Sequence, residues 1–233
     1  MKNKFTPPPY RLKAFTLSEV LVTLVVIGVV AAITVPTLFS YYQEQALKSS
    51  LEKNYSALKQ ALDRYQINNG ERLVTADLTE HRQLKGILMS EMNVMHDCSW
   101  GANDSKACIQ HYFSDDEATN DEKTSKNYKT LNGEKNIDLS YFNDGQFVLT
   151  DGSLILLEDW VNTRVFVSVD VNGFGKKPNR LGKDLFMFQL MPNGELLPMG
   201  AKGTWFYSAT DQFCSYSSDS DMNGAGCTYK KLK

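Results

Sequence analysis

The sequence has few of the residues and motifs on which catalysis depends. Its 233 residues include only three histidines, His81, His96 and His111. They are scattered, and none has a second ligand at helical spacing, so they indicate no metal centre. The phosphate-binding glycine-rich loop and the nucleophile elbow of hydrolases are both missing. We find no candidate catalytic residue and predict that the chain is not an enzyme.

An excess of positive charge is missing as well. The chain has 25 Lys and Arg against 27 Asp and Glu, a formal net charge of −2. This balance argues against a strongly basic nucleic-acid-binding protein, and we infer no specific nucleic-acid partner. Hydrophobic residues make up 42% and charged residues 22%, which is typical of a globular rather than a disordered chain.

Cysteine is scarce and has no metal-binding spacing. The four cysteines are Cys98, Cys108, Cys214 and Cys227, and neither close pair has the C-x-x-C form of zinc or redox motifs. An even number in an exported chain predicts two disulfides. Four cysteines allow three connectivities, and the sequence alone does not choose between them. Short loops close most easily, which favours the two local pairs.

What the chain does have is a long uncharged segment near its N-terminus. Residues 20–43 carry no formal charge, and about 20 apolar residues suffice for a helix to cross the hydrocarbon core of a membrane. Residues 1–14 have four basic residues and no acid, whereas 69–233 have more acids than bases. This charge order predicts a cytoplasmic N-terminus, a membrane segment and an exported acidic body.

Three interpretations of this segment compete. A secretory signal peptide needs a shorter apolar core followed by a small-residue cleavage site, but here Ile33 and Val35 continue the apolar run past the two alanines at 31–32. A plain membrane anchor leaves Glu19 unexplained, because a carboxylate at depth in a membrane costs roughly 2–3 kcal/mol. The third interpretation depends on the residues just before the run.

Residues 13–19 read Lys-Ala-Phe-Thr-Leu-Ser-Glu, and the apolar run follows at once. This segment resembles the cleavage and methylation segment of type IV prepilins, closely over about residues 11–42 and more loosely beyond. The resemblance implies that prepilin peptidase cuts between Ala14 and Phe15 on the cytoplasmic side and then methylates the amino group of Phe15. The family nearly always has Gly before the cut, so Ala14 predicts slower processing.

The resemblance also implies roles for three residues of the run. A carboxylate in an apolar helix seeks a partner charge, and for Glu19 the family implies the new amino terminus of Phe15 in a neighbouring subunit. That pair would set the axial register of a helical bundle. Gly28 and Pro36 lie where many family members have Gly and Pro, and Pro36 should kink the helix or let it melt locally.

An amphipathic pattern extends the helix beyond the membrane segment, and Asn68, Asn69 and Gly70 supply a stop signal. We predict one helix over 15–68, transmembrane over about 20–43, between a leader at 1–14 and an extracytoplasmic head at 69–233. A stripe of apolar residues should hold the head onto the helix. The stripe consists of Leu47, Leu51, Tyr55, Leu58, Leu62 and Tyr65.

The head has the signals of a short helix and an antiparallel sheet. Leu84, Ile87 and Leu88 suggest the helix, and turn signals at 151–152 and 192–194 each predict a hairpin. We expect four or five strands and, at 114–136, a long solvated polar loop. The strands are expected at 146–150, 153–157, 164–169, 185–190 and 195–197. The predicted fold class is α+β, and the resemblance implies a pilin-like fold.

Two polar loops are candidates for calcium. Asp170, Asn172, Asn179 and Asp184 offer oxygen atoms within one inter-strand loop. The alternative for this loop is a set of turns held by Asx hydrogen bonds.

The second loop has the first half of an EF-hand pattern at Asp219, Asp221 and Asn223, but Lys230 stands where the second half needs Glu. We expect no other cofactor.

The resemblance implies a structural subunit of a type IV pilus-like or type II secretion pseudopilus filament. Its partners would be other pilin-like subunits, the peptidase, the inner membrane and the assembly platform. The sequence does not choose between adhesion, motility, DNA uptake and secretion, or between a major and a minor subunit. The alternative is a membrane-anchored extracytoplasmic module that binds glycan or DNA, for which Trp100, Trp160 and Trp205 are candidates, although tryptophan more often serves packing.

Overall fold

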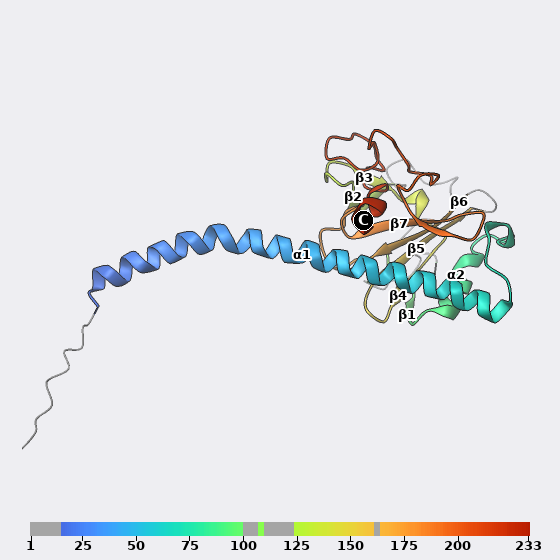
Figure 1. Ribbon diagram of the computed structural model, residues 1–233, viewed down its shortest axis with the longest axis horizontal. Coiled ribbons are helices and arrows are strands. Elements are labelled where there is room, and N and C mark those ends of the chain that lie inside the picture. The colour runs from blue at the N-terminus through green and yellow to red at the C-terminus, as the bar shows by residue number, and fades with distance from the viewer. Residues whose placement is uncertain (1–14, 100–106, 110–123, 161–163) are drawn as a thin grey trace, which may run out of the picture. The chain divides into compact units, whose positions relative to one another are not determined.

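The computed structural model describes residues 15–99, 107–109, 124–160 and 164–233. It divides into two units, 1–43 and 44–233, and each is described by itself. Helix α1, Leu17–Asn69, contributes residues to both units (Figure 1). The predicted leader at 1–14 lies outside the described residues.

Helix α1 begins at Leu17 rather than at the predicted residue 15, because Thr16 serves as its N-cap. It continues through Pro36 and ends where Gly70 takes a positive φ of 81°. The Gly70 N–H donates to the carbonyl of Gln66 at 2.8 Å, which closes the last turn. The stop signal is thus confirmed to within one residue, and a kink at Pro36 stays a prediction.

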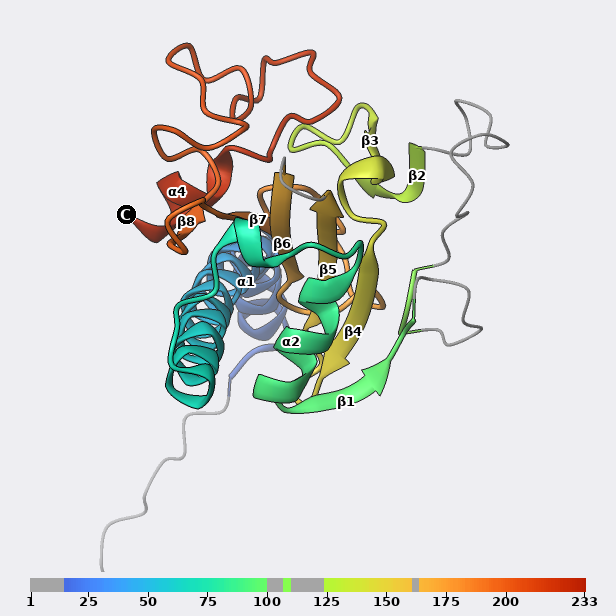
Figure 2. The same cartoon turned by 90° about the vertical axis from the view of Figure 1, so that its right-hand side faces the viewer.

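The described part of the head is built on a six-stranded antiparallel sheet (Figure 2). Both predicted hairpins are confirmed: one joins β4 to β5 and the other joins β7 to β8. The strands, in their order across the sheet, are β1 (Val94–Asp97), β4 (Gly145–Leu149), β5 (Leu154–Trp160), β6 (Arg164–Asp170), β7 (Leu185–Leu190) and β8 (Leu196–Pro198).

The central strands are buried on both faces, so successive side chains enter two different cores. On β5, Ile155 and Leu157 join one cluster while Leu154 and Leu156 join the other. The first cluster lies under α1 and α2 (Gln83–Glu91), which cover the same face of the sheet (Figure 2). This helix-on-sheet packing makes the fold α+β and pilin-like, as predicted.

The apolar stripe of α1 packs on the sheet as predicted. Leu51 and Leu58 are fully buried in the first cluster, and the other four stripe residues pack against it. Tyr55 stacks on Phe188 of β7 with ring centroids 5.0 Å apart, and its hydroxyl donates to the Leu196 carbonyl at 3.1 Å. Burial of each leucine contributes roughly 1.5–3 kcal/mol to folding.

Part of the segment expected as a solvated loop is structured. Strand β2 (Thr124–Lys129) pairs with β3 (Asn136–Asp138), and Tyr128 is fully buried in the second cluster. The expectation of an entirely solvated loop over 114–136 was wrong for this part, because the Tyr128 ring and its hydroxyl bond to Asp170 anchor the strand. Residues 114–123 lie outside the described ranges.

Two disulfides join neighbouring cysteines. Cys98 bonds Cys108, and Cys214 bonds Cys227, the first residue of α4 (Cys227–Leu232). These are the local pairs that short loop closure favours. The second bond holds the C-terminal segment near Met199, Phe206 and Met222, which cover the second face of the sheet.

Candidate assembly site

The start of α1 is closed by a reciprocal pair of side chains. The Glu19 carboxylate accepts hydrogen bonds from the Thr16 backbone N–H at 2.8 Å and from its hydroxyl at 2.9 Å. The Glu19 N–H donates back to the Thr16 hydroxyl at 3.2 Å. This is a capping box, in which Ser or Thr at the N-cap pairs with Glu three residues later. Glu19 therefore has a partner within its own chain.

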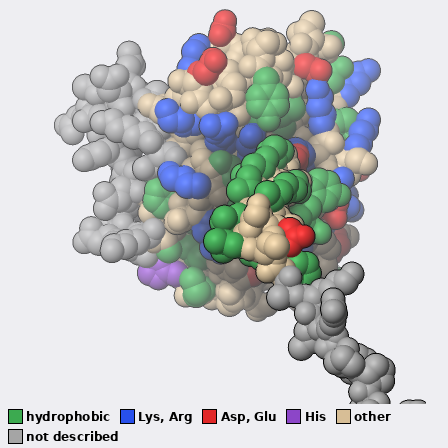
Figure 3. Space-filling model, turned by 90° about the vertical axis from the view of Figure 1, so that its left-hand side faces the viewer, with side chains coloured by type: hydrophobic (Ala, Val, Ile, Leu, Met, Phe, Trp, Pro, Cys, Tyr) green, Lys and Arg blue, Asp and Glu red, His purple; other side chains and the backbone are tan. Residues whose placement is uncertain are grey.

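The described residues of the first unit present a mostly apolar, exposed surface. Each residue from 15 to 43 is exposed, and Phe15 has 84% of its surface accessible. Among the described helices, α1 is the one whose length and composition suffice for a membrane span. Figure 3 views this part of α1 and shows hydrophobic side chains along it. Such a surface needs a covering of lipid or of other apolar helices.

Four hydroxyl groups in the described part of this unit are bonded to the helix backbone. The Thr23 hydroxyl donates to the Val20 carbonyl, and the Thr34 hydroxyl donates to the Val30 carbonyl, both at 2.9 Å. Thr37 and Ser40 bond back to the preceding turn in the same way. An unbonded hydroxyl is costly in hydrocarbon, so these bonds suit the helix to an apolar surrounding.

The other residues of the predicted site are placed as follows. Ala14 lies outside the described residues, and Phe15 precedes the helix. Gly28 has no heavy atom within 4 Å of the position that a Cβ would take, so in the isolated chain its surface is open. Sequence reasoning identified Glu19 but missed the N-cap role of Thr16, which the spacing T-x-x-E signals.

In the 170–184 loop, the first calcium candidate, each carboxylate is bonded to nearby backbone N–H groups, as the alternative of Asx-held turns predicts. The Asp170 carboxylate accepts from the N–H groups of Asn172 and Gly173 and from the Tyr128 hydroxyl. Asp184 accepts from the N–H groups of Asn179 and Arg180, both at 2.6 Å. Burial raises the pKa of Asp170 to about 7, and Asp184 adds to the rise.

The 219–223 loop is arranged differently. Asp219 and Asp221 are exposed, while Asn223 is fully buried. The Asn223 amide bonds the backbone of Ser215, accepting at 3.2 Å and donating at 2.7 Å. The Asn223 side chain therefore stabilises a turn inside the protein, whereas the Asp219 and Asp221 side chains lie in solvent.

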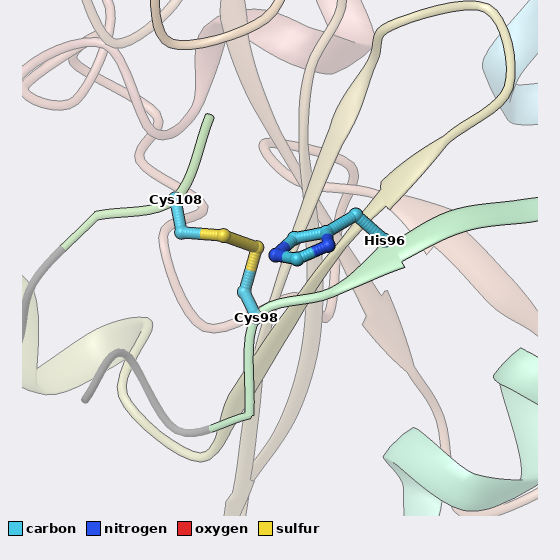
Figure 4. Close-up of side chains that lie close together, drawn as sticks. All are labelled: His96, Cys98 and Cys108. Carbon is cyan, nitrogen blue, oxygen red and sulfur yellow. A yellow bond between two sulfur atoms is a disulfide. The ribbon is translucent and has the colours of Figure 1, made fainter. Parts of the chain in front are cut away.

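The histidines form no centre of their own in the described ranges. His96 lies beside Cys98 and Cys108 (Figure 4), but both sulfur atoms belong to a disulfide and offer no thiolate to a metal. His81 pairs with Asp144, with Nε2 and Oδ1 2.6 Å apart. His111 lies outside the described residues.

Two of the tryptophans gather around one arginine. The Arg164 guanidinium lies 4.8 Å from the ring centroid of Trp160, 5.5 Å from that of Trp205 and 5.3 Å from that of Tyr141. Trp160 and Trp205 are each about half exposed, at 54% and 50%. Packing around a cation accounts for their positions. Trp100 lies outside the described residues.

Comparison with known proteins bears on the N-terminal segment. Residues 11–35 match the prokaryotic N-terminal methylation motif. The chain is similar to type II secretion system core protein G of Pectobacterium carotovorum subsp. carotovorum, with 34% identity over 68 residues. The match covers 29% of this chain and 43% of the relative, less than half of that protein's length. No solved structure matches the chain significantly.

These findings agree with the structure described above. The motif ends within the apolar half of α1 and includes both Glu19 and its partner Thr16. One N-terminal apolar helix together with this motif fits a membrane-anchored subunit. The methylation motif, the similar protein and the α+β fold together support a pilin or pseudopilin family for this chain, a family of structural proteins rather than enzymes.

Proposed function

We propose that this chain is a filament subunit that prepilin peptidase cleaves between Ala14 and Phe15 and methylates on Phe15. The observation that carries the proposal is the methylation motif at 11–35, which includes the start of the apolar helix α1, together with the exposure of every residue from 15 to 43. Before assembly the helix spans the inner membrane with the head outside the cytoplasm. After assembly the subunit belongs to a periplasmic or cell-surface filament, a pseudopilus or a pilus.

Helix packing drives assembly, and Glu19 sets its register. In the bundle, the Glu19 carboxylate of one subunit pairs with the Phe15 amino group of the next, because two opposite charges in an apolar surrounding gain far more from each other than in water. The capping box gives Glu19 a second role. One carboxylate oxygen accepts from Thr16, and the other remains available to accept from the neighbouring amine.

Three variants separate the charge of Glu19 from its capping role. Glu19→Gln keeps an acceptor for the cap but removes the charge, Glu19→Ala removes both, and Thr16→Val removes the hydroxyl while keeping the charge. We expect both Glu19 variants to insert in the membrane but to be absent from sheared or purified filaments. Thr16→Val should be incorporated. Incorporation of Glu19→Gln at the wild-type level would contradict the charge-pair register.

Processing is tested on protein taken from its native cell envelope. Intact mass and N-terminal sequencing should give a chain that begins at N-methylated Phe15. Ala14→Gly is the matched variant and should be processed faster, because Gly is the family's residue before the cut. A chain that still begins at Met1 would mean a plain anchor. A chain that begins after residue 32 would mean an ordinary secreted protein.

The second candidate, an anchored binding module for glycan or DNA, draws on the half-exposed Trp160 and Trp205 around Arg164. Exposed aromatic faces stack on sugars and on bases. A binding module needs no subunit register, so it tolerates Glu19→Ala, whereas a filament subunit does not. The double variant Trp160→Ala and Trp205→Ala should leave filament incorporation unchanged if assembly is the main function.

A further inference from the structure

The second unit, 44–233, has several lysines around its first residue, Glu44. The Lys231 side chain of α4 donates a hydrogen bond to the Glu44 carboxylate. This bond lowers the pKa of Glu44 below its ordinary value, and the positive charge of Lys183 adds to the shift. Lys48 lies one turn further along α1, on the same face as Glu44. Three lysines from three parts of the chain therefore lie near Glu44.

The loop between β6 and β7 adds basic residues at the same end of this unit. Residues 171–183 contain no acid and four bases, Lys176, Lys177, Arg180 and Lys183. Gly173 packs against the β4–β5 turn, because a Cβ there would lie 2.3 Å from the Gly152 carbonyl oxygen. That turn is tied to α1 by the ion pair between Lys53 and Asp151, at 2.7 Å. The loop therefore lies at the end of the sheet where the second unit begins.

The negative charges at this end are mostly buried or paired. The two aspartates that flank the loop are fully buried, and Glu44 and Asp151 each pair with a lysine. One exposed acid, Glu52, lies a further turn along α1. Four lysines form no ion pair among the described residues, Lys48, Lys176, Lys177 and Lys183. We call these four residues the lysine face, and Figure 3 shows basic side chains gathered on one side of the head.

The order of the chain places this end of the head beside the proposed membrane span. The uncharged segment ends at Gln43, and Glu44 follows it directly. Tyr41 and Tyr42 are both exposed at the end of that segment, and tyrosine is enriched where a membrane meets water. Lys48 lies about 6 Å beyond Glu44 at the rise of an α-helix. This distance is shorter than the Debye length of about 8 Å at physiological salt, so Lys48 is within reach of charges at the membrane surface.

We propose that the lysine face binds the headgroups of anionic phospholipids at the outer surface of the membrane that α1 spans. The proposal rests on the membrane anchoring proposed above and adds a second contact, made by the head. Clusters of basic side chains next to a membrane span attract anionic headgroups. A nucleic acid or an acidic protein carries the same sign of charge, but only the bilayer is held next to Lys48 by the chain itself.

This contact would act before assembly. It would hold the head against the bilayer while the subunit waits in the membrane. A subunit that enters a filament would have to break the contact, so the lipid composition of the membrane would affect how readily subunits leave it. Neither the apolar surface of α1 nor Glu19 supplies such a dependence on headgroup charge.

The experiment reconstitutes the full chain into vesicles of phosphatidylcholine, with and without added phosphatidylglycerol. An acetylating reagent that does not cross the membrane labels the lysines of outward-facing heads, and mass spectrometry gives the rate at each lysine. Lys176, Lys177 and Lys183 should be labelled about fivefold more slowly in the anionic vesicles, the effect of an anionic surface on one lysine. High salt should remove the difference, because it screens the charges. The loop lysines are the informative ones, since Lys48 lies beside the span whichever way the loop faces.

Two controls test whether the effect belongs to the lysine face. Lys59 is exposed and lies about 22 Å beyond Glu44 along α1, so it should be labelled equally in both kinds of vesicle. The double variant Lys176→Gln and Lys177→Gln should reduce the protection of Lys183 at least about twofold. The double variant Lys59→Gln and Arg72→Gln removes the same charge towards the other end of α1 and should leave the protection of Lys183 unchanged.

The outcomes separate this proposal from the filament proposal. If both kinds of vesicle retain the chain but the loop lysines are labelled equally in them, the lysine face does not bind lipid and the filament proposal is unaffected. If neither kind retains the chain after an alkaline wash, the membrane anchor and the lipid contact are both wrong. Protection by a DNA oligonucleotide, or by crowding of chains in neutral vesicles, without any from phosphatidylglycerol, would assign the face to another partner and overturn the proposal.

Discussion

Single carboxylates in this chain take their roles from the groups that donate to them. Glu19 accepts from Thr16 and so fixes the first turn of α1. Asp144 accepts from the Asp159 N–H at 2.8 Å, and His81 and Arg82 lie against its other oxygen. The sequence reveals the type of each residue and, for T-x-x-E, its local partner. It does not reveal that Asp170 and Asp184 are buried, because their burial depends on strands far apart in the chain.

The lowered pKa of one carboxylate, Asp151, predicts how the stability of the fold depends on pH. Partial burial favours the neutral form of Asp151, but hydrogen bonds from Lys53 and Ser153 outweigh it and lower its pKa below the ordinary value. A lowered pKa stabilises the fold above the unfolded-state pKa of about 4. That contribution is lost as the pH falls through the folded-state pKa. We expect Lys53→Gln to reduce the dependence of melting temperature on pH between about 5 and 2.

The matched control for this prediction is Lys202→Gln, at an exposed lysine outside the ion pairs described for this structure. This variant should have the wild-type pH dependence. The Lys53–Asp151 ion pair contributes little to stability, because Lys53 is largely exposed and solvent screens the pair. An unchanged pH dependence in Lys53→Gln would contradict the assigned role of the ion pair.

At the scale of elements, the docking of α1 on the sheet depends on a few leucines. Leu58 is 1% exposed, and Leu62, Leu84, Leu88 and Val167 lie around it. Leu58→Ala leaves a cavity and should lower the free energy of unfolding by about 2–5 kcal/mol. Ile67→Ala, on the exposed side of the same helix, should change it by less than about 0.5 kcal/mol. Denaturant unfolding of both variants checks this, and equal effects would contradict the packing.

Elements with local signals could be predicted, and elements that depend on distant pairing could not. The spacing of apolar residues marked the stripe of α1, and the turns at 151–152 and 192–194 marked two hairpins. Strand β1 was missed because its partner, β4, lies about fifty residues later and its register is interrupted after Val94. Strand β2 was missed because its sequence is polar, and Tyr128 alone does not predict burial against β6.

At the scale of the whole molecule, the C-terminal disulfide stabilises a segment with little regular structure. Cys214 and Cys227 close a loop with a sequence separation of 13 residues. The double variant Cys214→Ser and Cys227→Ser should lower the free energy of unfolding by about 2–4 kcal/mol. It should also speed proteolysis within residues 199–226. Limited proteolysis with peptide mapping checks this.

The other disulfide provides the comparison for that prediction. The double variant Cys98→Ser and Cys108→Ser should raise the rate of cleavage within 199–226 less, because its bond closes a different loop and reaches that segment only through the shared apolar cluster. If removal of the Cys214–Cys227 bond leaves this rate unchanged, apolar packing by Phe206 and Met222 is enough to hold the segment. The stabilising role of the bond would then be wrong.

The internal hydroxyl bonds of α1 have a consequence for exchange between membrane and filament. Four hydroxyl groups of this helix already donate hydrogen bonds to carbonyls of the same helix, those of Thr23, Thr34, Thr37 and Ser40. When lipid tails around the helix are replaced by other helices, none of these four hydroxyls has to break or make a hydrogen bond. If the chain assembles as proposed, the energy difference between the two surroundings would come mainly from packing and the Glu19 charge pair, and a subunit could return to the bilayer by the path along which it left.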